Sequence, residues 1–171
     1  MELSDAERLI LINQYRMLAI LDPKEKDYYE QGCEAMEEGY SQLYEEFLPH
    51  LEIPLSDEAY HLVWDILDVY QSIDLYKKSH PGDTEVAAHH HATFVGFDGN
   101  NETEYLALTR FVIKDMGRYD EQASLGADDF NSHWPMVQQY QNMVEIWKSY
   151  GGPAAKLSKE QVMSVLEAAS K

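Results

Sequence analysis

The spacing of apolar residues constrains this chain most, because it is helical along nearly the whole sequence. Apolar side chains recur at intervals of three and four residues, and no segment shows sustained alternation with a period of two. Ser4 with Glu7, and Ser158 with Gln161, form the capping boxes typical of helix starts. We therefore predict an all-α fold: a compact multi-helix bundle that begins with an N-terminal helical hairpin.

The domain organisation follows from one linker-like segment. Residues 79–84, Ser-His-Pro-Gly-Asp-Thr, contain the strongest turn-forming residues between helical patterns. They predict helical subdomains at residues 1–80 and 85–171. The stretch Leu9 to Leu21 is apolar nearly all round, so we expect this helix to be central and buried.

The charge of the chain limits its partners. The 171 residues carry 13 Lys and Arg against 31 Asp and Glu, a net charge of −18, and no Lys or Arg occurs from Asp27 to Tyr76. Such a surface repels phosphate, so we predict no direct binding to nucleic acid and none to an anionic membrane. Two explanations remain open: a solvated acidic face, or a docking surface for a basic partner, such as a DNA mimic presents. The candidate docking residues are Glu37, Glu38, Glu45 and Glu46.

The cellular location is predicted from cysteine content and from the N-terminus. One cysteine, Cys33, cannot form an internal disulfide, and residues 1–15 lack the basic region and cleavage site of a signal peptide. The apolar stretch that ends at Leu21 is too short to span a bilayer. We expect a cytoplasmic protein, and no cofactor is predicted.

An apolar seam marks the second expected helix, which runs to Phe47. Its side chains are spaced alternately by four and three residues, as in a helical hairpin or an intermolecular contact. Gly32 and Gly39 flank the seam, which suggests close approach of another helix. We predict a homo-oligomer, with these interface residues: Tyr29, Met36, Tyr40 and Phe47.

Residues 83–111 contain the polar side chains that most resemble a site. His89 and His91 could bind a metal ion, although adjacent side chains diverge and the alternative is an exposed polar segment. The turn before Asn101 predicts a helix start, with Asn101 as the cap and Glu104 as its reciprocal partner. Polar residues within apolar helices either pair with one another for stability or form a pocket for an anion or small molecule. The candidate ligand-binding residues are Asn13, Asp98, Arg110 and Arg118.

Several short motifs together resemble the YfbU family over nearly the whole chain. They are Arg8-Leu9-Ile10-Leu11, Asn13-Gln14-Tyr15, Leu21-Asp22-Pro23, Gly96-Phe97-Asp98, Tyr105-Leu106, Arg110-Phe111, Gly117-Arg118-Tyr119, Phe130-Asn131, Pro135-Met136, Tyr140-Gln141 and Trp147. The resemblance implies a small, all-helical bacterial protein of uncharacterised biochemical function, and it implies no catalytic residues. Trp134 departs from the family pattern, which favours a Thr cap there, so we expect Ser132 to cap the following helix with Pro135 in its first turn.

These observations favour a function in binding over one in catalysis. No nucleophile elbow and no phosphate-binding glycine loop occurs in the sequence. The leading hypothesis is a non-enzymatic acidic protein with an interaction or regulatory role that self-associates and docks a basic partner. The alternative is a small metal-assisted hydrolase that uses the histidine-rich connection at residues 83–98.

Overall fold

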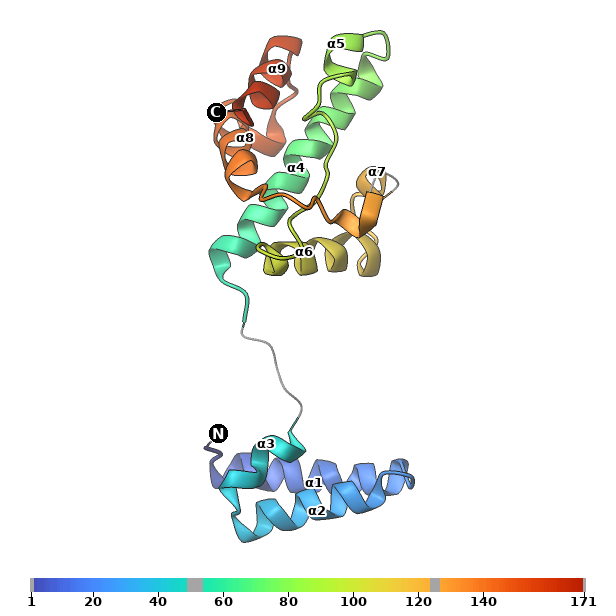
Figure 1. Ribbon diagram of the computed structural model, residues 1–171, viewed down its shortest axis with the longest axis vertical. Coiled ribbons are helices and arrows are strands. Elements are labelled where there is room, and N and C mark those ends of the chain that lie inside the picture. The colour runs from blue at the N-terminus through green and yellow to red at the C-terminus, as the bar shows by residue number, and fades with distance from the viewer. Residues whose placement is uncertain (1, 49–53, 124–126, 171) are drawn as a thin grey trace. The chain divides into compact units, whose positions relative to one another are not determined.

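The computed structural model describes residues 2–48, 54–123 and 127–170 (Figure 1). Contacts divide the chain into two units, Met1–Pro54 and Leu55–Lys171. Every regular element in the described residues is helical, and the one extended pairing is a single bridge between Phe97 and Asn131. The prediction of an all-α fold that begins with a helical hairpin is therefore confirmed.

The first unit is built on the hairpin of α1 (Asp5–Leu21) and α2 (Lys26–Glu38), which pack side by side (Figure 1). The Ser4 side chain accepts a hydrogen bond from the Glu7 amide, and the Glu7 carboxylate accepts one from the Ser4 amide, as the capping box predicts. A Cβ at Gly32 would lie 2.7 Å from the Tyr15 ring, so this glycine lets the helices approach closely. The core of the hairpin comprises Ile12, Tyr15, Cys33, Met36 and Tyr44.

The second helix ends earlier than the apolar seam predicts. Gly39 caps it in the left-handed region, with φ of 73°, and its amide donates to the Ala35 carbonyl. The chain continues through a 3₁₀ turn, Ser41–Leu43, into the short helix α3 (Tyr44–Phe47). Glycine adopts this conformation without the steric cost of a Cβ, so the turn interrupts the helix at Gly39.

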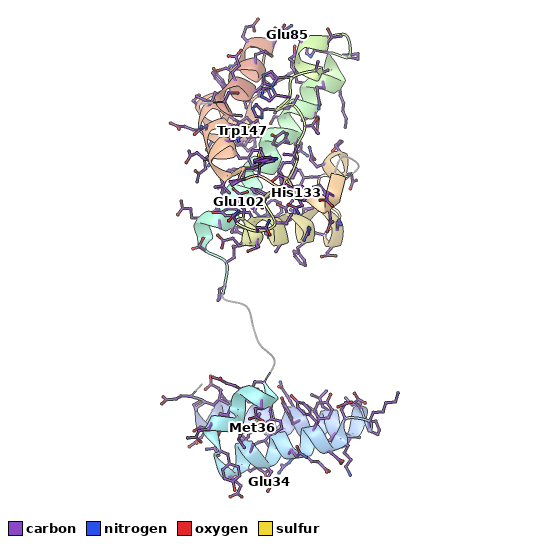
Figure 2. The ribbon with its side chains drawn as sticks, in the orientation of Figure 1. Glu34, Met36, Glu85, Glu102, His133 and Trp147 are labelled. Atoms are coloured by element: carbon purple, nitrogen blue, oxygen red, sulfur yellow. The ribbon has the colours of Figure 1, made fainter. Side chains whose placement is uncertain are left out.

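The second unit is organised around α4 (Asp57–Ser79), which Ser56 caps as expected. Helices α6 (Thr103–Arg110), α8 (Val137–Ser149) and α9 (Lys159–Ala168) pack against α4 (Figure 1). Trp147, on α8, lies at the centre of the unit (Figure 2). The other large aromatic side chains buried there are Tyr70, Tyr76, Phe94, Phe97, Phe130 and Tyr140.

The segment 79–84 lies inside this second unit, whereas the contacts place the division of the chain between Pro54 and Leu55. The short helix α5 (Thr84–Ala87) packs on α9. Lys159 holds the two together, because its Nζ lies 3.1 Å from Asp83 and 2.7 Å from Glu85. Turn-forming residues here therefore mark a connection within a unit.

The expected helix from Asn101 to Tyr119 is also interrupted. Helix α6 ends at Arg110, and a π-helical turn, Phe111–Asp115, follows it before Gly117 turns the chain with φ of 62°. The remaining helix, α7 (Asp120–Ala123), lies against α4. Among the described helices, none combines the length and apolar character that crossing a membrane requires.

Two distant loops cross at the Phe97–Asn131 bridge. The Phe97 amide donates to the Phe130 carbonyl over 3.0 Å, and the Ser132 amide donates to the Phe97 carbonyl over 3.0 Å. Asp128, Asp129 and Phe130 all have φ between 46° and 61°. Such a run of left-handed residues is costly, and the burial of Phe130 among aromatic rings opposes that cost.

Substitution of Gly96 should destabilise the second unit strongly. Gly96 has φ of 89°, and a Cβ there would overlap the Phe130 carbonyl. We expect Gly96→Ala to lower the free energy of unfolding by about 3 kcal/mol or more. Urea unfolding followed by tryptophan fluorescence measures this, because all three tryptophans (Trp64, Trp134 and Trp147) belong to the second unit.

The matched control is Gly82→Ala. No atom lies within 4 Å of a Cβ placed at Gly82, so this change should have little effect. A similar loss of stability in both variants would contradict the role assigned to the crossing.

Candidate functional site

The most exposed apolar surface of the first unit is one side of α1, which we call the outer face. Five large side chains of this face, Leu9, Ile10, Met17, Ile20 and Leu21, are between 56% and 79% exposed. Asn13 and Gln14 lie among them on the same side of the helix and are also exposed. Only Ile12 and Tyr15 of α1 are buried, on the opposite side. The expectation that this helix is buried is therefore wrong within its own unit.

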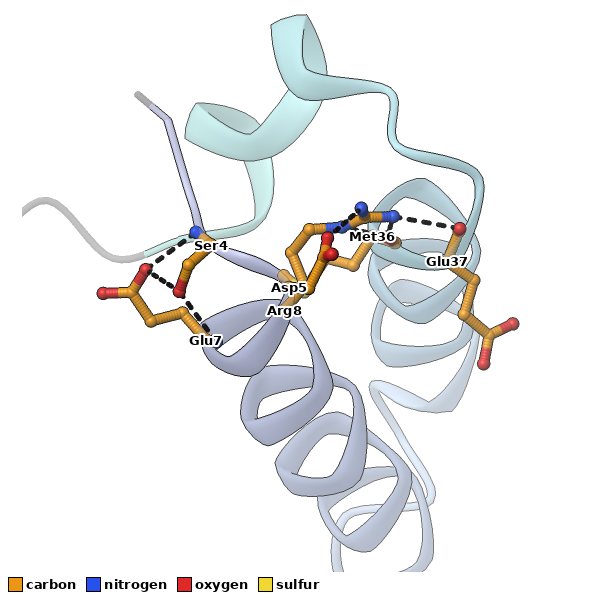
Figure 3. A network of polar contacts seen from close by, with 6 residues as sticks. All are labelled: Ser4, Asp5, Glu7, Arg8, Met36 and Glu37. Atoms are coloured by element: carbon orange, nitrogen blue, oxygen red, sulfur yellow. Dashed lines mark hydrogen bonds and ion pairs between the residues drawn. The ribbon is translucent and has the colours of Figure 1, made fainter.

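The two arginines of α1 are directed toward α2. Arg16, the one charged residue between Leu9 and Leu21, forms an ion pair with Glu37 of α2. Arg8 donates through Nε to the Met36 carbonyl over 2.8 Å and through Nη2 to the Glu37 carbonyl over 3.0 Å (Figure 3). Both arginines thus bind α2, and the outer face itself carries no charge.

The carboxylates predicted as a docking surface belong to the other helices of the same unit, and Glu37 lines a hollow together with Leu9 of the outer face. Glu37 and Glu38 end α2, and Glu45 and Glu46 belong to α3. All four are exposed, although Glu37 is engaged with Arg16. Glu34, one turn before Glu38, points away from the hairpin (Figure 2). The first unit therefore combines an acidic side on α2 and α3 with an uncharged apolar side on α1.

The predicted interface residues mostly serve the hairpin itself. Met36 is fully buried between the two helices (Figure 2), and Tyr29 and Phe47 pack against the same core. The Tyr15 ring contacts the Tyr29 ring edge-on, with centroids 5.7 Å apart. Only Tyr40 is substantially exposed. Three of the four side chains thus stabilise the unit, and the exposed apolar side chains lie on α1 instead.

The densest buried polar network of the second unit surrounds Glu102 (Figure 2). One carboxylate oxygen, Oε1, accepts from the Met136 and Val137 amides over 2.7 Å and 2.8 Å. The other, Oε2, accepts from the Asp98 amide over 3.0 Å. Glu102 therefore caps α8 from a distant part of the chain, whereas Ser132 was expected to cap that helix. Glu102 is also the N-cap residue of α6, whereas Asn101 was expected there.

Asp98 is buried beside Glu102 and is also fully engaged. Its carboxylate accepts from the Asn100 amide over 2.9 Å and from the Asn101 side chain. These hydrogen bonds lower the pKa of the Asp98 carboxyl below its usual value, because they stabilise the charged form. The two carboxylates act as acceptors that hold the loop.

The other candidate ligand residues have separate partners. Arg110 donates through Nε to the Asp129 carbonyl over 2.9 Å and pairs with its carboxylate. The Arg118 guanidinium lies 5.1 Å from the centre of the Trp64 ring, a cation–π contact. Asn13 belongs to the first unit and is exposed. These contacts favour structural pairing for the two arginines.

The rings of the histidine triplet lie close together, with His89 and His90 stacked and the His91 ring tilted against both. The ring centroids of His89 and His90 are 4.8 Å apart, and those of His90 and His91 are 3.8 Å apart. Partial burial is the larger cause that lowers the pKa of both His89 and His91, and the neighbouring His90 ring is the second cause. Within residues 2–48, 54–123 and 127–170, no three His, Cys, Asp or Glu side chains are arranged to hold a metal ion.

A groove of about 350 Å³ runs between α4 and residues 153–157. Its volume is sufficient for a small molecule. Two of the polar side chains that line it already have partners, however: Tyr76 donates to Asp83 over 2.9 Å, and Ser72 accepts from Trp147 over 3.1 Å. These two hydroxyl groups are therefore engaged within the protein.

Comparison with known proteins places the whole chain in one family. The model of the YfbU domain matches residues 1–168. The chain belongs to the YfbU family. It is also 39% identical, over 169 residues, to the UPF0304 protein MJECS11 of Methanocaldococcus jannaschii, an alignment that covers 97% of this chain and 99% of that protein. The family assignment made from short motifs is confirmed, and the alignment with that relative extends over both units of this YfbU chain.

Removal of the Glu102 carboxylate should destabilise the second unit of this YfbU protein. Glu102→Ala leaves three backbone amides without an acceptor in a buried setting, so we expect a loss of about 3 kcal/mol in unfolding free energy. Glu104→Ala, two residues away on the exposed side of α6, should change it by less than about 0.5 kcal/mol. Urea unfolding monitored by tryptophan fluorescence compares the two, and equal losses would contradict the capping role of Glu102.

The histidine stack should make stability depend on pH. Because the pKa values of His89 and His91 are lowered below 6.5 in the folded protein, the unfolded chain binds more protons as the pH falls through that range. The stabilising contribution is therefore present above about pH 6.5 and is lost below it. In His90→Gln the neighbouring positive charge is absent, so unfolding free energy measured between about pH 5 and pH 8 should vary less steeply. An unchanged or steeper slope would contradict this account.

Proposed function

We propose that this YfbU protein is a non-enzymatic interaction protein whose first unit self-associates and docks a basic partner. The observation that supports the proposal is the separation of two surfaces on one hairpin. The outer face of α1 is apolar and uncharged, whereas the exposed side chains of α2 and α3 include Glu34, Glu37, Glu38 and Glu46. Exposed apolar surface of this extent is typical of interaction sites.

The acidic side is suited to a basic protein by its charge. Carboxylates spread over α2 and α3 create a negative potential that attracts a cationic surface and accelerates the encounter. The same potential repels phosphate, so we propose that the protein binds neither nucleic acid nor an anionic membrane directly. A protein with this surface would compete with DNA for a basic partner.

The metal-assisted hydrolase remains the alternative, but no observation favours it. A zinc site of that kind needs a third protein ligand beside His89 and His91. No suitable group of three occurs in the part of the chain that the structure describes. The contacts of His91 are with the other two rings and with Ser170.

The docking proposal is tested with a fluorescent lysine-rich peptide. Fluorescence anisotropy should show binding that weakens as salt increases, because exposed charges are screened. Conversion of Glu37, Glu38, Glu45 and Glu46 to Gln should weaken it by roughly tenfold or more, since four carboxylates leave the proposed contact surface.

The matched control removes the same number of charges from exposed positions of the second unit: Glu104→Gln, Asp115→Asn, Asp120→Asn and Glu145→Gln. Both variants have the same net charge, and only the first should lose affinity. Equal losses would mean that the peptide responds to total charge, and this would contradict a specific docking surface.

A further inference from the structure

The groove between α4 and residues 153–157 offers apolar surface to a ligand. On one side it is lined by a single stripe of α4, from Asp68 to His80, about 18 Å long at the rise of an α-helix. Leu75, in the middle of this stripe, is 60% exposed. The opposite wall includes Pro153 and Ala155. A ligand in the groove would therefore bury apolar groups that are now in contact with water.

The segment 153–157 runs toward the C-terminal end of α4. Trp147, which precedes the segment, donates to Ser72 over 3.1 Å. Lys159, which follows it, lies 3.1 Å from Asp83, beyond the end of α4. The last residues of the segment are therefore distant from Asp68, which lies one turn before Ser72 at the other end of the groove.

Two backbone amides of this segment, those of Lys156 and Leu157, have no hydrogen-bond acceptor among the described residues. The chain is extended at Ala155, with φ of −90° and ψ of 133°, so no helical carbonyl serves them. Leu157 is only 6% exposed, and buried amides in proteins nearly always bind the protein, water or a ligand. Both residues line the groove, so a ligand there would supply the acceptor.

The Lys156 side chain also has no partner within the described residues. The other described lysines and arginines of the second unit each pair with a carboxylate, or with the Trp64 ring in the case of Arg118. The chain has 31 Asp and Glu for 13 Lys and Arg, so carboxylates are in excess. A cation that stays free in such a chain, beside two free amides, favours an anionic ligand.

The carboxylates nearest to the groove are engaged elsewhere. Asp83 binds Lys159 and accepts from Tyr76 over 2.9 Å. Asp68 accepts from Tyr119 over 2.6 Å at the other end of the groove. Neither carboxylate therefore takes up the donors of Lys156.

We propose that this groove binds a small organic carboxylate. The ligand's carboxylate accepts from the Lys156 ammonium and from the amides of Lys156 and Leu157, and its apolar body lies along Leu75. The His80 ring stacks on the Tyr76 ring, with centroids 4.3 Å apart, and its other face suits a flat apolar group. A volume of about 350 Å³ is within the range of small-molecule sites. The site belongs to the second unit and is independent of the docking proposed for the first.

Phenylbutyrate tests the site, with phenylbutanol and phenylbutylamine as probes that differ from it at the terminal carbon. Titration of the isotope-labelled full chain, followed by heteronuclear NMR, should shift the amide signals of Lys156 and Leu157, because the carboxylate becomes their acceptor. A ligand of this size should bind with a Kd on the order of 1 mM. The alcohol and the amine should bind about tenfold more weakly, because they lose the charge-assisted hydrogen bonds.

Two pairs of variants separate the charged and apolar contacts. Lys156→Gln should weaken phenylbutyrate binding by about tenfold, whereas Lys24→Gln, which removes the same charge from an exposed position of the first unit, should not. Leu75→Gln should weaken binding of all three probes by several-fold. Its control is Leu9→Gln, since Leu9 is 59% exposed but lies in the first unit.

Four outcomes would overturn the inference. Equal affinity for the three probes would mean that only apolar contact holds them. Tighter binding of phenylbutylamine would mean that Asp68 selects a cation. Equal effects of Lys156→Gln and Lys24→Gln would mean that the probe responds to total charge. Absence of shifts at Lys156 and Leu157, at a probe concentration tenfold above the expected Kd, would mean that the groove holds no carboxylate.

Discussion

The carboxylate of Glu102 is the constraint on which the second unit most depends. It joins the start of α6, the loop at Asp98 and the first amides of α8 through three hydrogen bonds. The Phe97–Asn131 bridge crosses the same region, and Gly99 and His133 both donate to the Asn131 side chain. The chain that leaves Glu102 must therefore come back to Phe97 and Glu102. This requirement explains the left-handed conformations of Asp128, Asp129 and Phe130.

The parts of the fold that sequence alone predicts are those with local causes. The capping boxes at Ser4 and Ser158, the cap at Ser56 and the helical period all depend on residues within one or two turns of one another, and the structure contains each of them. The cap of α8 could not be predicted in this way, because Glu102 lies 34 residues from Met136. The burial of Glu102 is seen only in the structure, and the sequence around it does not indicate which amides it will bind.

The candidate surfaces also show that sequence alone predicts local features better than the partners of those features. The apolar seam of residues 29–47 correctly indicates a helix contact, but a periodic stripe does not reveal whether its partner is α1 of the same hairpin or another chain. Met36 and Gly32 pack against α1, so this part of the seam is buried within the first unit. Conversely, Leu9 to Leu21 is apolar nearly all round, yet only the side that contains Ile12 and Tyr15 is buried, against α2. The exposure of the four acidic residues could be predicted from the sequence, because Glu and Asp side chains are normally exposed. These residues are Glu37, Glu38, Glu45 and Glu46.

Separation of charge from apolar surface resolves a conflict between the two proposed activities. A chain of net charge −18 resists self-association, because identical copies repel each other. In this hairpin the outer face itself carries no charge, because Arg8 and Arg16 bind carbonyl and carboxylate groups of α2, whereas Asp5 and Glu7 begin α1. Self-association, where it occurs, would double the number of acidic docking surfaces, and it would raise affinity for any partner that itself has two basic sites.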